Sequence, residues 1–446
     1  MSSPSPPEGA EGGGRASRLG VAVLGALLGG LLGGFIVVGV TLILKAGIDF
    51  ASRQGPLFVA VVPLAGLALS VLVLWGLGRA AGVANFDRLS PSSWRTFPPD
   101  AARADISRDV VESAGQEERF PWRLAPIRAL AILATVGLGG AMGTEAPAAY
   151  LGVAVGASLT DRGRWRRLLR PAALAGGAAG VGALMGIALV GTGFMLELGR
   201  RNRAPLSAER VIAALIGGLI GWGIDAVFGL SLIRLVAPHE PPTDLLHAAI
   251  TALLIGTAAG AVSSAAAIAV YRAKTWQASP AVRLALGGAA ALATTLLLTR
   301  IASPAAAVGP GGGAILWAER DLAPPLLIAA VCVLRALATT AAMAAGGCGG
   351  VFVPFLAVGD LAGRVFAPGL GIGHDLSGAA GAAGGIAAGY QLPVTAAFMV
   401  LFVGGPPRAV LTSLATVIVA SLAGAAVHTA FGRFRLFRLR RRQAVH

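Results

Sequence analysis

The chain has 446 residues, of which 55% are hydrophobic and 13% charged, and its mean hydropathy is +0.75. A soluble domain of this composition could not cover its surface with polar side chains, so the sequence predicts an all-α polytopic membrane protein. The net charge of +15 does not indicate nucleic-acid binding, because the arginines gather at the ends of apolar runs.

Several apolar runs are long enough to cross a bilayer, which takes roughly 18–25 residues. They follow a tail at residues 1–18 that we expect to be disordered, and the first is too long for a cleavable signal peptide. In chain order the runs cover about residues 19–44, 56–77, 211–236, 248–270 and 409–427, with a shorter candidate at 284–298. Residues 85–120 are charged and turn-rich, which indicates a surface loop with a short helix.

Arginines crowd residues 161–170, 199–203 and 433–442. Because positively charged loops stay on the cytoplasmic side, we expect these segments and both termini to be cytoplasmic, in a protein of the cell membrane. The basic segment 433–446 is expected to contact anionic membrane lipid.

Residues 171–198 must then enter and leave the membrane on the same side. These 28 residues are too few for two full crossings at about 1.5 Å per residue. We expect two short, glycine-broken helices that turn back inside the membrane. Such pieces are tolerated only where protein or a water-filled cavity surrounds them, as in a transporter or channel interior.

The chain also carries a weak internal duplication, because P-x4-G-x3-G follows both Pro147 and Pro354. We expect two membrane halves, residues 19–236 and 237–432. Halves of this kind assemble around a substrate site where broken helices point their ends inward.

Glu145 is the one charged residue in a long apolar stretch and lies in the sequence GTEAPAAYLG (143–152). Pro147 suits the first turn of a helix, so we expect a helix over Ala146–Leu159 that starts inside the membrane. Its free N–H groups and dipole favour an anion, and the Glu145 carboxylate can take that place. The alternative is a glutamate that merely caps its own helix, but an acid at membrane depth is functional by default.

A second helix start that could attract an anion lies in GGCGGVFVPFLAVG (346–359), where we expect Pro354 to start another helix. The N–H groups of Val351, Phe352 and Val353 would then form a second anion-attracting helix end.

Together, GTEAP and GGVFVP resemble the G-[RK]-E-G-P and GG-x-F-x-P signatures of the CLC chloride channel and transporter family. The resemblance implies a homodimer of inverted-repeat subunits, each with its own pathway for chloride or another small anion, and Glu145 as the gating glutamate. It implies anion-binding backbone groups at Ala146, Pro147, Gly350, Val351, Phe352 and Val353, with Gly143, Gly349 and Pro354 as motif residues.

The sequence departs from the family pattern at several ligand positions. A gap-free alignment places Ala104 where the family has a serine ligand, and Phe434 or Arg433 where it has a central tyrosine. Thr144 replaces the signature arginine. We therefore expect a central site without hydroxyl ligands and with weaker or altered anion selection.

The candidate proton pathway is FMLEL (194–198). Family exchangers carry two acids at this place, and here Glu197 fits the first but Leu198 replaces the second. A single acid at this place, Glu197 without a second at 198, resembles the channel branch of the family. Alternatively, Glu197 is an interfacial acid paired with Arg200 and Arg201.

The remaining charges in apolar sequence, Asp225, Arg335 and Asp360, are expected to pair or to line a vestibule. His374 and His428 are read as interfacial or loop residues. Cys332 and Cys348 both lie in or beside apolar sequence, so they predict neither a disulfide framework nor a metal site. We expect no cofactor, no metal and no catalytic centre.

Three functions remain open from the sequence. The first is passive or weakly proton-coupled anion transport, the second is proton-coupled exchange of chloride or fluoride, and the third is a non-conducting scaffold that has kept the fold.

Overall fold

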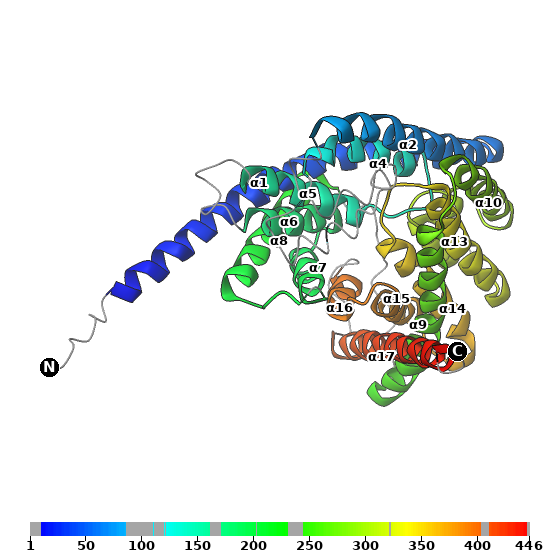
Figure 1. Ribbon diagram of the computed structural model, residues 1–446. Coiled ribbons are helices and arrows are strands. Elements are labelled where there is room, and N and C mark those ends of the chain that lie inside the picture. Colours follow the sequence, from blue (N-terminus) through cyan, green and yellow to red (C-terminus); the bar gives the residue numbers. More distant parts are fainter. Residues whose placement is uncertain are drawn as a thin grey trace.

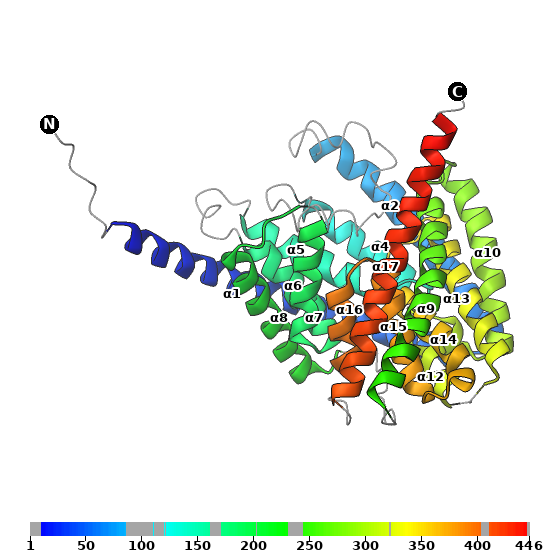
Figure 2. The same ribbon diagram turned by 90° about the horizontal axis from the view of Figure 1, so that it is seen from below.

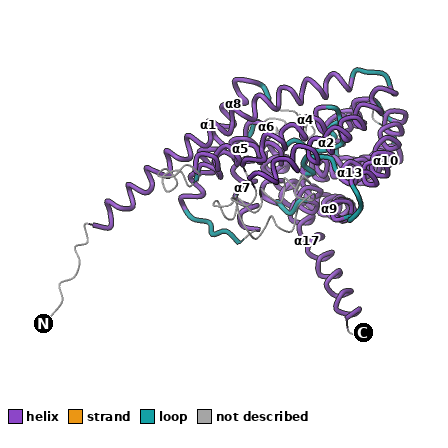
Figure 3. Tube along the Cα trace, turned by 45° about the horizontal axis from the view of Figure 1, so that its top comes forward, coloured by secondary structure: helices purple, strands orange, loops and turns teal. Residues whose placement is uncertain are grey.

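The computed structural model describes residues 10–85, 110, 120, 122–160, 171–201, 203–230, 244–320, 323–402 and 410–443. Helices and their connecting turns make up this part of the chain (Figure 3). Over the described residues, strand-like pairing is limited to one isolated bridge between Gly143 and Gly350. The predicted all-α class is therefore confirmed.

The helices fall into two groups that follow one another along the chain. The first group is α1 (Ala10–Ser52), α2 (Pro56–Asn85), η3 (Trp122–Leu124), α4 (Ala125–Gly137), α5 (Glu145–Thr160), α6 (Ala172–Met185), α7 (Ala188–Arg201) and α8 (Ala208–Phe228). The second group is α9 (Leu245–Thr275), α10 (Pro280–Ile301), α11 (Pro304–Ala307), α12 (Gly312–Arg320), α13 (Pro325–Ala345), α14 (Phe352–Leu370), α15 (His374–Gly389), α16 (Pro393–Phe402) and α17 (Val410–Gln443). Helices α5 to α8 lie on the left of Figures 1 and 2, and α9, α13 and α14 lie on the right.

The two groups pack in the same order. In the first, α6 is buried along its whole length and contacts α1, α5, α7 and α8. In the second, α15 takes the same place and contacts α9, α14, α16 and α17.

Small residues make both central contacts possible. A Cβ atom on Gly152 would lie 2.0 Å from the Gly176 carbonyl oxygen, and one on Gly359 would lie 2.4 Å from that of Gly381. The glycines of the repeated P-x4-G-x3-G pattern therefore bring α5 onto α6 and α14 onto α15, backbone against backbone.

The segment 171–198 forms two short helices, as expected. Helix α6 ends at Gly186, which has a left-handed φ of 67°, and α7 begins at Ala188 and returns along α6. Surrounding helices bury α6, which meets the requirement that broken helices be enclosed by protein.

Eight helices among the described residues are long and apolar enough to cross a membrane. They include the expected runs, although the run predicted over 211–236 lies in a helix that ends at Phe228, before a left-handed Gly229. Residues 231–236 lie outside the described residues. The sequence analysis missed Pro325–Ala345 and Phe352–Leu370, because charged side chains interrupt them.

Of the charged segment 85–120, the structure describes Asn85, Val110 and Phe120. The Val110 and Phe120 side chains are buried in the core, and the Phe120 ring lies 5.0 Å from that of Tyr150. At these two positions the expectation of a surface loop is wrong, because apolar side chains anchor the segment to α5.

The close contact between α5 and α6 predicts a large effect of one methyl group. We expect Gly152→Ala to lower stability by about 1–3 kcal/mol or more, since the new Cβ meets backbone that cannot rotate away. The measurement is the midpoint of thermal unfolding in detergent. The matched control is Gly39→Ala in α1, where nothing lies within 4 Å of the added carbon; equal midpoints for the two variants would contradict the packing argument.

Candidate functional site

The site is organised by two loops, one before α5 and one before α14. The Gly143 N–H donates to the Gly350 carbonyl and the Gly350 N–H donates to the Gly143 carbonyl, each at 2.7 Å. Gly143 precedes Pro147 by the same four positions as Gly350 precedes Pro354, so corresponding points of the repeated pattern pair with each other. The pairing brings the starts of α5 and α14 together inside the protein.

This crossing leaves little room for side chains. A Cβ on Gly143 would lie 2.5 Å from the Glu145 Oε2 atom, and one on Gly349 would lie 2.7 Å from the Met142 Cβ. The three motif residues that the sequence analysis singled out, Gly143, Gly349 and Pro354, therefore lie in or directly after the paired loops.

Glu145 is the first residue of α5 and is fully buried. Its Oε1 atom accepts a hydrogen bond of 2.9 Å from the Thr144 hydroxyl, and the Val353 N–H at the start of α14 also faces the carboxylate. Its buried Oε2 atom has no hydrogen-bond partner among the described residues. The carboxylate thus occupies the junction of two helix starts, where positive dipole ends favour negative charge.

Not every backbone group expected to bind an anion can do so. The Gly350 N–H is committed to the Gly143 carbonyl, so its assignment as an anion ligand is wrong in this conformation. Pro147 has no N–H and cannot donate at all. Helix α14 begins at Phe352, two residues before the predicted start, because Pro354 fits within the first turn. Ala146 occupies the second position of α5.

An aromatic cluster lies directly beside these helix starts. The ring centroids of Phe352 and Phe194 are 5.6 Å apart, those of Phe352 and Tyr390 are 5.3 Å apart, and those of Phe194 and Tyr390 are 6.1 Å apart. All three side chains are buried. Sequence reasoning gave no role to Phe194 or Tyr390, although both lie in stretches it quoted, because only the fold brings α7 and the end of α15 to Phe352.

Glu197 has a different environment from the one expected. Its carboxylate accepts hydrogen bonds from the Val394 N–H at 2.9 Å, the Thr395 N–H at 2.7 Å and the Thr395 hydroxyl at 2.6 Å. It therefore caps the start of α16, and the expected pairing with Arg200 and Arg201 is not present among the contacts of the described residues. Leu198 is buried, as an apolar side chain should be.

Two expected replacement ligands cannot be placed. Ala104 lies outside the described residues. Phe434 belongs to α17, but its side chain, like that of Arg433, lies outside the described part.

Arg335 is fully buried in the middle of α13 and contacts carbonyl groups at and just beyond the end of α11. Its guanidinium donates to the carbonyls of Ala307 at 3.0 Å and Gly309 at 2.7 Å, with a longer bond to Ala306. The oxygen dipoles at a helix C-terminus attract positive charge. Arg335 therefore has a structural role, which the sequence alone left undecided between pairing and lining a vestibule.

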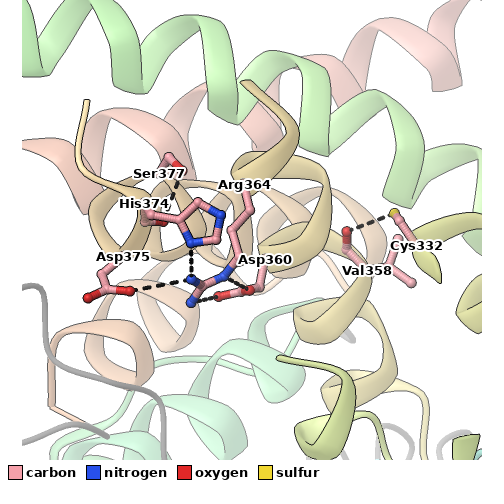
Figure 4. Close-up of polar contacts among 7 residues, drawn as sticks. All are labelled: Cys332, Val358, Asp360, Arg364, His374, Asp375 and Ser377. Atoms are coloured by element: carbon pink, nitrogen blue, oxygen red, sulfur yellow. Dashed lines mark hydrogen bonds and ion pairs between the residues drawn. The ribbon is translucent and has the colours of Figure 1, made fainter. Parts of the chain in front are cut away.

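Asp360 pairs with Arg364 one turn along α14 (Figure 4). The Arg364 Nε–Asp360 Oδ1 distance is 2.6 Å, and both side chains are 2% exposed. The same guanidinium reaches His374 Nδ1 at 2.8 Å and Asp375 Oδ1 at 3.3 Å at the start of α15. His374 is thus part of an ion-pair network and is more than a loop residue.

The remaining residues that the sequence analysis noted have local contacts. Asp225 accepts a 2.6 Å hydrogen bond from the Leu230 N–H just beyond the end of α8, and the His428 ring contacts the Gln391 side chain. Cys332 and Cys348 are free and buried. The described residues contain no group of three or more His, Cys, Asp or Glu side chains that could hold a metal ion.

The fold and this site define the class: a polytopic helical membrane protein whose broken helices begin inside the protein, around a buried carboxylate. The family described as "Voltage gated chloride channel" matches residues 89–425, and the chain belongs to this family. This match confirms the resemblance of the two motifs to the CLC family, which is a family of anion-transport proteins.

Individual relatives are distant. The chain is 26% identical over 395 residues to "H(+)/Cl(-) exchange transporter ClcA" of Yersinia pseudotuberculosis serotype IB (strain PB1/+), covering 84% of this chain and 79% of the relative. A crystal structure of a CLC-type fluoride/proton antiporter matches with a TM-score of 0.68 at 19% identity, covering 92% of this chain and 95% of that one. A slow cyanobacterial Cl−/H+ antiporter matches with a TM-score of 0.66 at 18% identity, with the same coverage. At these identities the structures show the shared fold.

The ion-pair network of Figure 4 predicts unequal effects for its two acids. We expect Asp360→Ala to cost about 3–5 kcal/mol, because it leaves the buried Arg364 guanidinium without its nearest carboxylate. Asp375→Ala should cost much less, since that side chain is 23% exposed and its contact is longer. The measurement is the apparent thermal unfolding midpoint of each purified variant, and a larger drop for Asp375→Ala would contradict this assignment.

Proposed function

We propose that this chain moves a small anion, chloride first, across the cell membrane along a pathway gated by the Glu145 carboxylate. The observation that carries the proposal is the position of this carboxylate, fully buried where two helix starts meet. Helix starts of this kind bind anions through free N–H groups and the helix dipole. A carboxylate seated there occupies the place of a mobile anion.

Gating follows from competition for the same groups. When an anion displaces the carboxylate, or when protonation removes its charge, the helix starts become free to bind the anion. The N–H groups at the start of α14, at Phe352 and Val353, are the donors we assign to the anion, together with that of Ala146 in α5. The apolar rings of Phe352, Phe194 and Tyr390 border this place.

We further propose that transport is channel-like or only weakly coupled to protons. Leu198 cannot exchange a proton, and the Glu197 carboxylate already accepts three hydrogen bonds that hold the start of α16. This arrangement gives Glu197 a structural role at the start of α16.

The second candidate is proton-coupled exchange of chloride or fluoride. It is favoured by the printed names of the relatives, which include a chloride exchanger and a fluoride antiporter. In that case a group other than Leu198 must carry protons to the cytoplasmic side.

The assembly we propose is a homodimer in the lipid bilayer with cytoplasmic termini, each subunit built from halves at 19–236 and 237–432. The matching packing of α6 and α15 within their groups supports the division into halves.

Efflux from liposomes tests the main proposal. Purified protein is reconstituted with chloride or fluoride inside, and anion release and external pH are recorded together. We expect anion release that changes strongly, by about tenfold or more, in Glu145→Ala, because removing the buried carboxylate vacates the helix starts. Release from wild type with little proton movement supports a channel, whereas a fixed ratio of protons to anions supports the exchanger. An absence of release for every anion would leave only the scaffold.

The cap on α16 predicts the behaviour of Glu197. We expect Glu197→Ala to lower stability by about 0.5–2 kcal/mol, because the start of α16 loses its acceptor, with the proton-to-anion ratio unchanged. The matched control is Glu209→Ala, an exposed acid in the first turn of α8. Loss of proton movement with stability intact would make Glu197 a relay and overturn the assignment as a cap.

A further inference from the structure

Thr144 and Glu145 form a contact that the family signature does not contain, since the signature has arginine or lysine at this position. The Thr144 hydroxyl lies 2.9 Å from Glu145 Oε1, and the two residues are 1% and 0% exposed. An ionised carboxylate can only accept hydrogen bonds, so the hydroxyl is the donor.

The position of Thr144 explains why its hydroxyl is available. Thr144 immediately precedes α5, and its carbonyl accepts the helical hydrogen bond from the Ala148 N–H at 2.9 Å. A threonine at this position ordinarily accepts a hydrogen bond from the N–H of the second or third helical residue. Here the third residue is Pro147, which has no N–H, so the Ala146 N–H is the one that remains for such a cap. The contact that the hydroxyl makes is with the side chain of the first helical residue, to which it donates.

This bond matters because, among the described residues, it is the hydrogen bond that the carboxylate receives from another side chain, beside the backbone N–H groups of Thr144, Glu145 and Val353 that also face it. Its Oε2 atom is buried and has no hydrogen-bond partner among the described residues, so Thr144 is the side chain recorded as holding the carboxylate. When the carboxylate moves away, this bond is lost. The hydroxyl thus stabilises the seated carboxylate relative to the displaced one.

We propose that Thr144 is a positioning residue that holds the Glu145 carboxylate over the two helix starts and so sets how readily an anion displaces it. The inference rests on the proposed function, because it presumes that an anion competes for that place. It adds a determinant of apparent anion affinity that is specific to this sequence.

The test is the apparent affinity of the full-length detergent-purified protein for chloride and for fluoride, measured by calorimetry and by the anion-dependent rise in unfolding midpoint. We expect Thr144→Val to bind the anion about tenfold more tightly than wild type, because a hydrogen bond to a charged group no longer opposes displacement. Thr144→Ser keeps the hydroxyl and should restore weaker binding. Thr144→Ala serves as a second hydroxyl-free variant if the valine variant does not fold.

Glu145→Ala separates positioning from a direct role of Thr144. In that background the hydroxyl has no carboxylate to hold, so we expect Thr144→Val to have no further effect on affinity. An equal effect of Thr144→Val with and without the carboxylate would overturn the inference, because it would make Thr144 a direct ligand or a purely structural residue. Unchanged affinity in both hydroxyl-free variants would also overturn it while leaving Glu145-gated transport intact. Failure of both wild type and Glu145→Ala to bind any anion would instead overturn the proposed function, and the role of Thr144 with it.

Discussion

The paired hydrogen bonds between Gly143 and Gly350 are the constraint on which the rest of the site depends. They join two loops that are distant in sequence and set the start of α5 against the start of α14. Side chains have little room at the crossing: a Cβ on Gly349 would meet the Met142 Cβ, and one on Gly143 would approach the Pro354 ring and the Glu145 carboxylate. The same pairing keeps the helix starts enclosed in protein and away from lipid.

The buried charged side chains of this protein differ in the partners that compensate their charge. Arg335 donates to carbonyl groups at and just beyond the end of α11, and Asp360 and Arg364 neutralise each other within α14. Glu197 is surrounded by donors from the start of α16. The Glu145 carboxylate accepts from the Thr144 hydroxyl and faces the Val353 N–H, while its Oε2 atom, like the Arg335 Nε atom, has no hydrogen-bond partner among the described residues. What distinguishes Glu145 is its place at two helix starts, which suits a gate.

Leu198 stands where the resemblance to the family's exchangers implies a second acid. Leu198 is buried and inert, and Glu197 lies on the adjacent residue but contributes to the fold through α16. A fold shared at under 20% identity does not fix the transport mode, so the fold shared with antiporters leaves it open to the flux measurement.

The sequence by itself determined the class of protein, most of the spans, the broken pair at 171–198, and the central place of Glu145. These follow from local signals: apolar run length, loop charge, and proline and glycine beside a lone acid. It could not find the spans at Pro325–Ala345 and Phe352–Leu370, because their charges are neutralised by partners distant in sequence or at neighbouring helix turns. Nor could it assign Glu197 to the cap of α16, exclude the Gly350 N–H as an anion ligand, or place Tyr390 beside Phe352. Those contacts join segments up to about two hundred residues apart, and only the tertiary structure decides which of them meet.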